Sequence, residues 1–274
     1  MVKKIMFGNF KGGVGKTTNS VMVSYELAKK GYKTLVIDLD PQANSTQILS
    51  RTYTLQNGKE LEFNNTMMKS IQEENIEKNI VSIMENLELL PSYKDFVNYP
   101  DFLEMKFLPT EDNYKEKRIS YFSHLMKNIE NQYDYIIMDV PPTLSIFTDT
   151  ALYATDEVII VLQTQQRSLD GAEAFMEYLQ DVYDKYTSID FDVAGILPVL
   201  MKNDSVVDNQ IIEDAKEDFG EEMIFDTVVR HMERLKRYDR KGISDPDYTT
   251  KWDVHDKRVH EVYSDVVDEL IERG

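Results

Sequence analysis

The chain has 274 residues, 42% of them hydrophobic, which is enough for a substantial core in one or two domains. It contains no cysteine, which excludes disulfides, thiolate metal sites and thiol catalysis. The formal net charge of −18 opposes non-specific attraction to nucleic acid, so any nucleic-acid surface requires a local inversion of charge.

The first elements predict a nucleotide-binding loop. An apolar strand over residues 4–9 precedes a helix over Lys16 to Lys30, which Gly31 ends, and the two are joined by Phe10-Lys11-Gly12-Gly13-Val14-Gly15-Lys16-Thr17-Thr18. The glycines let backbone N–H groups curl around a polyphosphate, Lys16 reaches the terminal phosphates, and the Thr17 hydroxyl suits Mg²⁺. The positive end of the helix points at the same anion. Phe10 departs from the strict G-x-x-x-x-G-K-[ST] pattern, which has glycine there.

The variant loop from Lys11 to Thr17 resembles the deviant Walker A motif of the ParA/MinD ATPases. This resemblance implies that the residues from Lys11 to Thr18 bind ATP and that Lys11 and Lys16 take part in hydrolysis. It also implies that Lys11 reaches across a homodimer interface to the partner subunit's nucleotide. A flexible glycine turn, the simpler interpretation, does not explain two lysines and two threonines at this spacing.

The next strand, over residues 33–38, runs into Ile37-Asp38-Leu39-Asp40-Pro41-Gln42. Carboxylates at this end of a parallel strand lie where ligands bind in α/β folds. In the resembling family the second aspartate of the D-x-D-P-Q segment belongs to switch I and helps to place the attacking water. The resemblance gives this role, and a place at the metal, to Asp40, while Asp38 supports the loop or the Mg²⁺ shell. A capped turn without chemistry is the alternative.

Residues 51–118 are polar with weaker periodicity, and we interpret them as an elaborating insertion within a single domain spanning residues 1–274. A helical cap without chemistry of its own is the simplest interpretation of this segment. Apolar runs at 87–90, 133–139, 158–162 and 193–200, with a helical pattern over 171–183, follow the first two strands. Their alternation predicts an α/β fold of P-loop NTPase type, with a doubly wound, mostly parallel sheet flanked by helices.

Tyr135-Ile136-Ile137-Met138-Asp139 is an apolar strand that ends in aspartate, which suits Mg²⁺ or its bound water. Pro141-Pro142-Thr143 then matches the switch II segment of the resembling family. In similar proteins the segment 198–203 flanks the adenine, which makes Met201 the candidate contact. A buried core methionine is the alternative for Met201.

Residues 229–241 are strongly basic within an acidic chain, and Arg230, Arg234, Arg237 and Lys241 recur at roughly helical spacing. If helical, they form one positive stripe suited to DNA phosphates. The position matches that of the basic residues with which ParA-like proteins bind DNA non-specifically. An ordinary solvated face is the alternative. The four histidines are scattered and predict no metal site.

The last segment, from Val259, predicts a helix with Val259, Val262, Val266 and Leu270 facing inward and acidic residues outward. A membrane-surface helix would be basic on its polar face, and no stretch approaches the length of a transmembrane span. Together with the absence of a signal-peptide core after Met1, these features predict a cytoplasmic protein without membrane contact. The DNA binding that the family resemblance implies would make it nucleoid-associated.

The resemblance as a whole implies a ParA-type partition ATPase with ATP and Mg²⁺ as cofactors. ATP closes a sandwich dimer, the dimer binds double-stranded DNA of any sequence, and a ParB-like centromere-binding partner stimulates the hydrolysis that releases it. The alternative is a MinD-like positioning switch that acts on a protein partner without DNA, and the acidic C-terminal helix argues against its membrane-bound form.

Overall fold

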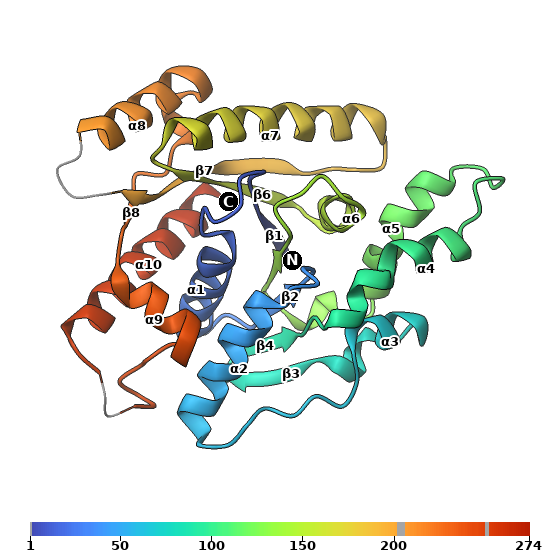
Figure 1. Ribbon diagram of the computed structural model, residues 1–274, viewed down its shortest axis with the longest axis horizontal. Coiled ribbons are helices and arrows are strands. Elements are labelled where there is room, and N and C mark those ends of the chain that lie inside the picture. The colour runs from blue at the N-terminus through green and yellow to red at the C-terminus, as the bar shows by residue number, and fades with distance from the viewer. Residues whose placement is uncertain (1, 202–205, 250–251) are drawn as a thin grey trace.

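The computed structural model describes residues 2–201, 206–249 and 252–274. Eight strands within these residues form one sheet in the order β3-β4-β2-β5-β1-β6-β7-β8, which is parallel except where β3 meets β4 (Figure 1). The strands are β1 (Lys3–Gly8), β2 (Thr34–Asp38), β3 (Val81–Met84), β4 (Leu87–Leu90), β5 (Tyr135–Asp139), β6 (Glu157–Gln163), β7 (Asp192–Met201) and β8 (Val229–Arg230).

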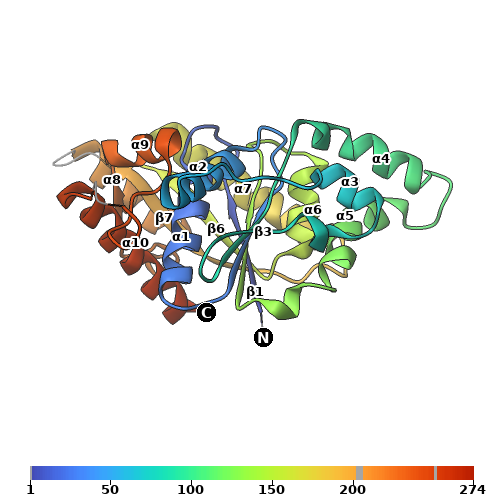
Figure 2. The ribbon, with the colours of Figure 1, turned by 90° about the horizontal axis from the view of Figure 1, so that it is seen from below.

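Helices cover both faces of the sheet, with α1 and α10 on one side and α5 and α6 on the other (Figure 2). The first face carries α1 (Lys16–Lys29), α2 (Asn44–Asn57), α9 (Glu233–Lys241) and α10 (Val254–Arg273). The second carries α3 (Met67–Gln72), α4 (Tyr99–Lys106), α5 (Tyr114–Met126), α6 (Ile146–Ala154), α7 (Gln166–Lys185) and α8 (Val206–Phe219). Short 3-10 helices lie at Ile76–Asn79, Lys94–Asn98, Glu130–Gln132 and Glu221–Met223.

The strand pleat divides the core into two layers. In β1, Met6 packs with the second group of helices, whereas Ile5 and Phe7 pack with the first. The fold class predicted from the sequence is confirmed, and the predicted strands agree with the observed ones to within two residues at each end. The sequence patterns missed β3, β8 and the helix α2.

The segment 51–118 is more than a helical cap. Helix α2 continues through Arg51, so the expected start of the insertion falls inside a helix. Further along, β3 and β4 extend the edge of the sheet, with β4 parallel to β2. The organisation as one domain with an insertion stays a prediction.

The parallel register gathers three predicted segments at one end of the sheet. Strand β5 lies between β1 and β2, so Asp139 pairs in register with Phe7 on one side and with Asp38 on the other. The loop after β1 and the turn after β2 therefore meet beside Asp139, at the carboxyl ends of the strands where α/β folds bind ligands.

Candidate functional site: a phosphate-loop cavity and a separate basic surface

The glycine-rich loop between β1 and α1 is shaped for close approach of an anion. Gly15 caps α1 in the left-handed region, with φ of 96°, which suits glycine because it lacks a Cβ. Val14 is fully buried and anchors the loop. Asn9 fixes its start, since its side chain donates to the Val161 carbonyl at 2.8 Å and accepts from the Lys11 N–H at 2.8 Å.

The Lys16 ammonium lies inside this loop, where it donates to the carbonyls of Asn9 at 2.9 Å and Lys11 at 3.3 Å. Burial lowers the pKa of Lys16 to about 8, although the nearby carboxylates of Asp139 and Asp40 act in the opposite direction. A desolvated cation held only by neutral carbonyls gains strongly from an anionic partner. The loop thus presents Lys16 to a phosphate.

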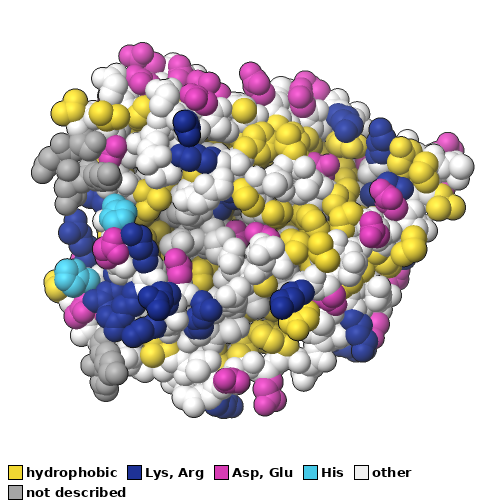
Figure 3. All heavy atoms as spheres, viewed as in Figure 1, with side chains coloured by type: hydrophobic (Ala, Val, Ile, Leu, Met, Phe, Trp, Pro, Cys, Tyr) yellow, Lys and Arg dark blue, Asp and Glu magenta, His cyan; other side chains and the backbone are white. Residues whose placement is uncertain are grey.

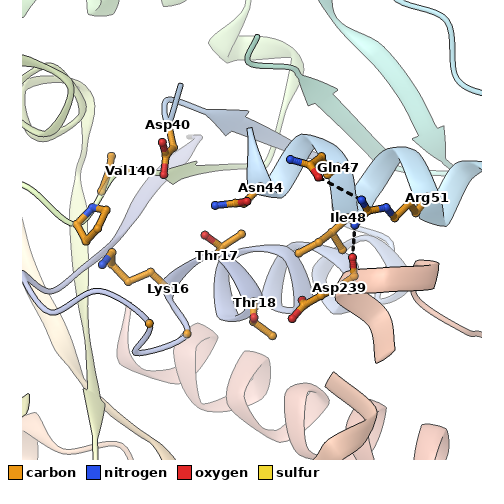
Figure 4. Close-up of a pocket in the computed structure, with 13 residues that line it drawn as sticks. Lys16, Thr17, Thr18, Asp40, Asn44, Gln47, Ile48, Arg51, Val140 and Asp239 are labelled. Atoms are coloured by element: carbon orange, nitrogen blue, oxygen red, sulfur yellow. Dashed lines mark hydrogen bonds between the residues drawn. The ribbon is translucent and has the colours of Figure 1, made fainter. Parts of the chain in front are cut away.

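A cavity of about 480 Å³ opens above the loop (Figure 4). It is lined by Gly13, Gly15, Lys16, Thr17, Thr18, Asp40, Asn44, Gln47, Ile48, Arg51, Val140, Pro142 and Asp239. Helix α2 contributes four of these residues at positions i, i+3, i+4 and i+7, which is one face of a helix. Sequence reasoning missed this face, although the spacing of Asn44, Gln47, Ile48 and Arg51 directly after the D-x-D-P-Q segment carried the signal.

Asp38 and Asp139 are fully buried and lie side by side on the neighbouring strands β2 and β5. Asp38 accepts from the Asp40 N–H at 3.1 Å and from the Thr46 N–H and hydroxyl at 2.8 and 2.7 Å, which assigns it to support of the turn. Asp139 accepts from the Ser45 hydroxyl at 2.6 Å. Burial raises the pKa of both carboxyls, with the charge of Asp139 adding to the effect on Asp38.

The chemistry of Asp139 fits a divalent cation. Its Oδ1 is buried without a hydrogen-bond partner, and the Thr17 hydroxyl is near enough to lower the pKa of the carboxyl. Within the described ranges no three acidic or histidine side chains converge as a protein metal cage. A Mg²⁺ ion held by Thr17 and Asp139 would therefore complete its shell with phosphate oxygens and water, as this ion commonly does.

Asp40 lines the cavity, and only 7% of its surface is exposed. Burial raises the pKa of its carboxyl, while the Gln42 N–H, which donates at 2.8 Å, and the charge of Lys16 oppose that shift. The structure thus brings Asp40 and Lys16 to one cavity, as the sequence predicted. Asp40 stands at the cavity wall, which suits contact with a water beside a bound phosphate.

Two other predicted nucleotide contacts lie away from this cavity. The Lys11 ammonium donates to the side chains of Gln163 at 3.3 Å and Gln165 at 3.0 Å, and Lys11 does not line the cavity. Met201 is 5% exposed at the end of β7 and does not line the cavity, which fits the core alternative. Lys202 and Asn203, the last two residues of the predicted adenine segment, lie outside the described residues.

The basic segment forms a surface patch, but not the single helical stripe that we expected. Arg230 lies on β8, before α9 begins. Arg234 turns inward, with 9% of its side chain exposed, and pairs with Asp253 and with the buried Asp256, the latter at 3.5 Å. A stripe containing Arg234 is therefore a wrong prediction, because its guanidinium is held by these two carboxylates of α10 and its cap.

Basic side chains nevertheless gather over α9 and the start of α10, where Figure 3 shows a cluster of lysine and arginine. We define the basic patch as the partly or fully exposed residues Lys236, Arg237, Arg240, Lys241, Lys257 and Arg258. A second cavity of about 430 Å³ at its edge is lined in part by Arg237, His255 and Arg258. The contribution of α10 to this patch was missed, because it depends on how α10 packs beside α9.

Comparison with known proteins decides the family. Residues 2–193 match the AAA domain family AAA_31. This chain belongs to that family. It is also 28% identical to the sporulation initiation inhibitor protein Soj of Bacillus subtilis (strain 168), over the full length of both chains. The resemblance to the ParA-type partition ATPases, predicted from the loop, is confirmed.

Solved structures share the fold of this AAA domain chain. The Cyanothece McdA(D38A)–ATP complex has a TM-score of 0.78 at 21% identity and covers 99% of this chain and 96% of its own. The AMPPNP-bound putative plasmid partition protein from Borrelia burgdorferi has a TM-score of 0.75 at 20% identity, with both chains fully covered. At these identities the likeness shows the fold alone. None of the helices in the described residues is long and apolar enough to cross a membrane.

Proposed function

We propose that this protein is an ATP-dependent DNA partition ATPase that binds non-specific double-stranded DNA as an ATP-driven homodimer. The observation that carries the proposal is the cavity that the buried Lys16 and Asp40 both line, with Lys16 also within the electrostatic influence of Asp139, whose Oδ1 has no hydrogen-bond partner. The full-length similarity to Soj supports the partition role.

In this proposal each residue around the cavity has a separate task. The amides from Gly12 to Thr18 and the N-terminus of α1 cradle the phosphates, and Lys16 exchanges its two carbonyl partners for phosphate oxygens. Thr17 and Asp139 hold Mg²⁺, with Asp40 nearby. When bound, the ion would neutralise charge that develops on the phosphate oxygens.

Asp40 orients the attacking water by accepting a hydrogen bond from it. In-line attack depends on this positioning, because phosphoryl transfer requires little covalent chemistry from the protein. The raised pKa of Asp40 lies in the direction that assists proton acceptance, while the charge of Lys16 opposes that shift. Lys11, held outside its own cavity by two glutamines, acts on the nucleotide of the partner subunit.

The phosphate site is tested by Lys16→Ala, with Lys30→Ala as the matched control. Lys30 is an exposed lysine at the other end of α1, paired with Asp268. Removing a charged phosphate contact costs about 1.5–3 kcal/mol, so ATP affinity measured by calorimetry falls roughly 10- to 150-fold for Lys16→Ala and stays unchanged for Lys30→Ala. Equal affinities of the two variants would refute the assignment.

The DNA surface is the basic patch, which a dimer presents twice. Its local positive charge offsets the net charge of −18. DNA binding should weaken steeply with salt, because log affinity falls against log salt concentration with a slope of about −0.9 per neutralised phosphate. Hydrolysis, stimulated by a centromere-binding partner, releases the DNA in this scheme.

The DNA surface is tested with Arg237→Glu/Lys241→Glu against Lys78→Glu/Lys115→Glu. Both pairs change the net charge equally, and the control residues are exposed on the other side of the sheet. We expect the patch variant to lose binding to duplexes of any sequence while its basal ATPase rate is kept. Equal loss of DNA binding in the control variant would show that net charge alone causes the effect. Strong preference for one DNA sequence would contradict non-specific binding.

A further inference from the structure

Helix α2 begins at two buried carboxylates, those of Asp38 and Asp139. In its first turn, Ser45 donates its hydroxyl to Asp139 at 2.6 Å, and Thr46 donates its N–H and its hydroxyl to Asp38 at 2.8 and 2.7 Å. The start of α2 is therefore tied to the pair of buried carboxylates nearest to the proposed metal position. A further ligand on Asp139 would therefore compete with the Ser45 hydrogen bond, one of the contacts that hold the start of this helix.

The middle of α2 is joined to the basic helix α9. The Arg51 guanidinium donates to the backbone carbonyl of Asp239, and the Thr52 hydroxyl accepts from the Ile243 N–H at 3.0 Å. Gly242, with φ of +85°, packs so closely that a Cβ would lie 2.5 Å from the Arg51 carbonyl carbon and the Thr52 nitrogen. Only glycine permits this approach of two backbones.

The joint forms part of the cavity wall. Arg51 and Asp239 both line the ATP cavity, at the end opposite Lys16 (Figure 4). Arg51 is also held by the side chain of Gln47 at 3.1 Å, one turn earlier on the same face of α2. Contacts at both ends of the cavity thus converge on one helix of 14 residues, about 21 Å long.

We propose that α2 transmits the state of the nucleotide site to the basic patch, with Arg51, Thr52 and Gly242 as the positioning residues of the joint. A Mg²⁺ ion held at Asp139 would compete with the Ser45 hydroxyl for this carboxylate, and the start of α2 would then shift. The tight joint carries α9 with it, which changes how the patch is presented. Where it concerns DNA, this inference rests on the proposed function.

The physical requirement for such a coupling is that the nucleotide contacts the two arrangements differently. Ser45 supplies that difference, because it holds α2 through Asp139, the carboxylate for which a Mg²⁺-nucleotide would compete. By linkage, the factor by which ATP tightens DNA binding equals the factor by which DNA tightens ATP binding. The coupling is therefore measurable from either ligand.

Amide hydrogen exchange provides the decisive measurement. In the wild type, addition of ATP and Mg²⁺ should change exchange in the α9 peptide as well as in the phosphate loop. At ATP concentrations that saturate each variant, the loop response should remain in Arg51→Ala and Thr52→Val and the α9 response should be lost. Thr52→Ser, which keeps the hydroxyl, should restore it, and Asn57→Ala, an exposed α2 residue bonded only to Tyr53 within its own helix, should behave as wild type.

A second readout uses duplex DNA. For wild type and Asn57→Ala, we expect the affinity for duplex DNA to be about tenfold or more higher with ATP than with ADP. For Arg51→Ala, we expect this ratio of DNA affinities to be less than about threefold. Light scattering checks that each variant still forms the ATP-dependent dimer. If Thr52→Val fails to fold, Arg51→Ala decides the question, because its side chain is exposed.

The outcomes separate this inference from the proposed function. The inference is overturned if the change in α9 hydrogen exchange persists in Arg51→Ala or is missing in the wild type. This holds whatever the DNA-binding results are. An α9 response that depends on Arg51, in a protein that binds no duplex in either nucleotide state, supports the inference and refutes the DNA-binding function.

Discussion

Replacing Arg234 by alanine should destabilise the protein far more than replacing its neighbours on α9. The change leaves Asp256, which is fully buried, without its cationic partner 3.5 Å away. Breaking a buried ion pair from one side costs about 3–5 kcal/mol. The pairing with Asp253, whose side chain is 46% exposed, adds little because solvent screens it.

Two donors to Asp256 remain in the variant and moderate this cost. The Tyr238 hydroxyl donates at 2.8 Å, and the Asp253 N–H donates at 3.1 Å. We therefore take the lower end of the range, about 3 kcal/mol. For a protein of this size that corresponds to a fall in Tm of about 6–12 °C.

Thermal unfolding followed by circular dichroism measures this, with Lys236→Ala as the control. Lys236 is exposed and pairs with Glu233 on its own helix, so its removal should change stability by less than about 0.5 kcal/mol. If Arg234→Ala and Lys236→Ala melt at the same temperature, the inward orientation of Arg234 is incorrect. Conversely, if Arg234→Ala melts at a much lower temperature than Lys236→Ala, any loss of DNA binding in Arg234 variants results from impaired folding and not from a lost phosphate contact.

Other predictions follow from the same structure. Asp40→Ala should retain ATP binding but hydrolyse ATP much more slowly and accumulate the ATP dimer, whereas loss of ATP binding would make Asp40 a mainly structural residue. Lys11→Ala should bind ATP as a monomer yet show no dimer by light scattering with a slowly hydrolysed analogue, and a normal dimer would contradict action across the interface. Burial alone lowers the pKa of His260, but its contact with Glu26 outweighs this and leaves the pKa raised. The stabilisation from this charged contact is thus present below pH 6.5 and is lost as pH rises through the folded-state pKa of His260. In urea unfolding, His260→Gln should therefore lose more stability at pH 6 than at pH 9. An equal loss at both pH values would refute this assignment.

The sequence alone determined the features that depend on neighbours along the chain. The glycines and lysines of the loop from Lys11 to Thr18 specify a phosphate site through backbone conformation and short-range reach. The strands that end in Asp38 and Asp139 follow from continuous apolar runs, which are typical of strands buried on both faces of a parallel sheet. These local signals were sufficient for the fold class and for much of the cavity.

The tertiary structure decided what depends on contacts between distant segments. Helix α2 was missed because its polar sequence has a weak apolar period, and it is held by Asp38, Asp139 and the Asp239 carbonyl of α9. Arg234 looked like part of a basic stripe because spacing along a helix does not reveal which side meets Asp256 on α10. Only packing brings Arg51 and Asp239, 188 residues apart, into one cavity wall, since such a contact has no local signature.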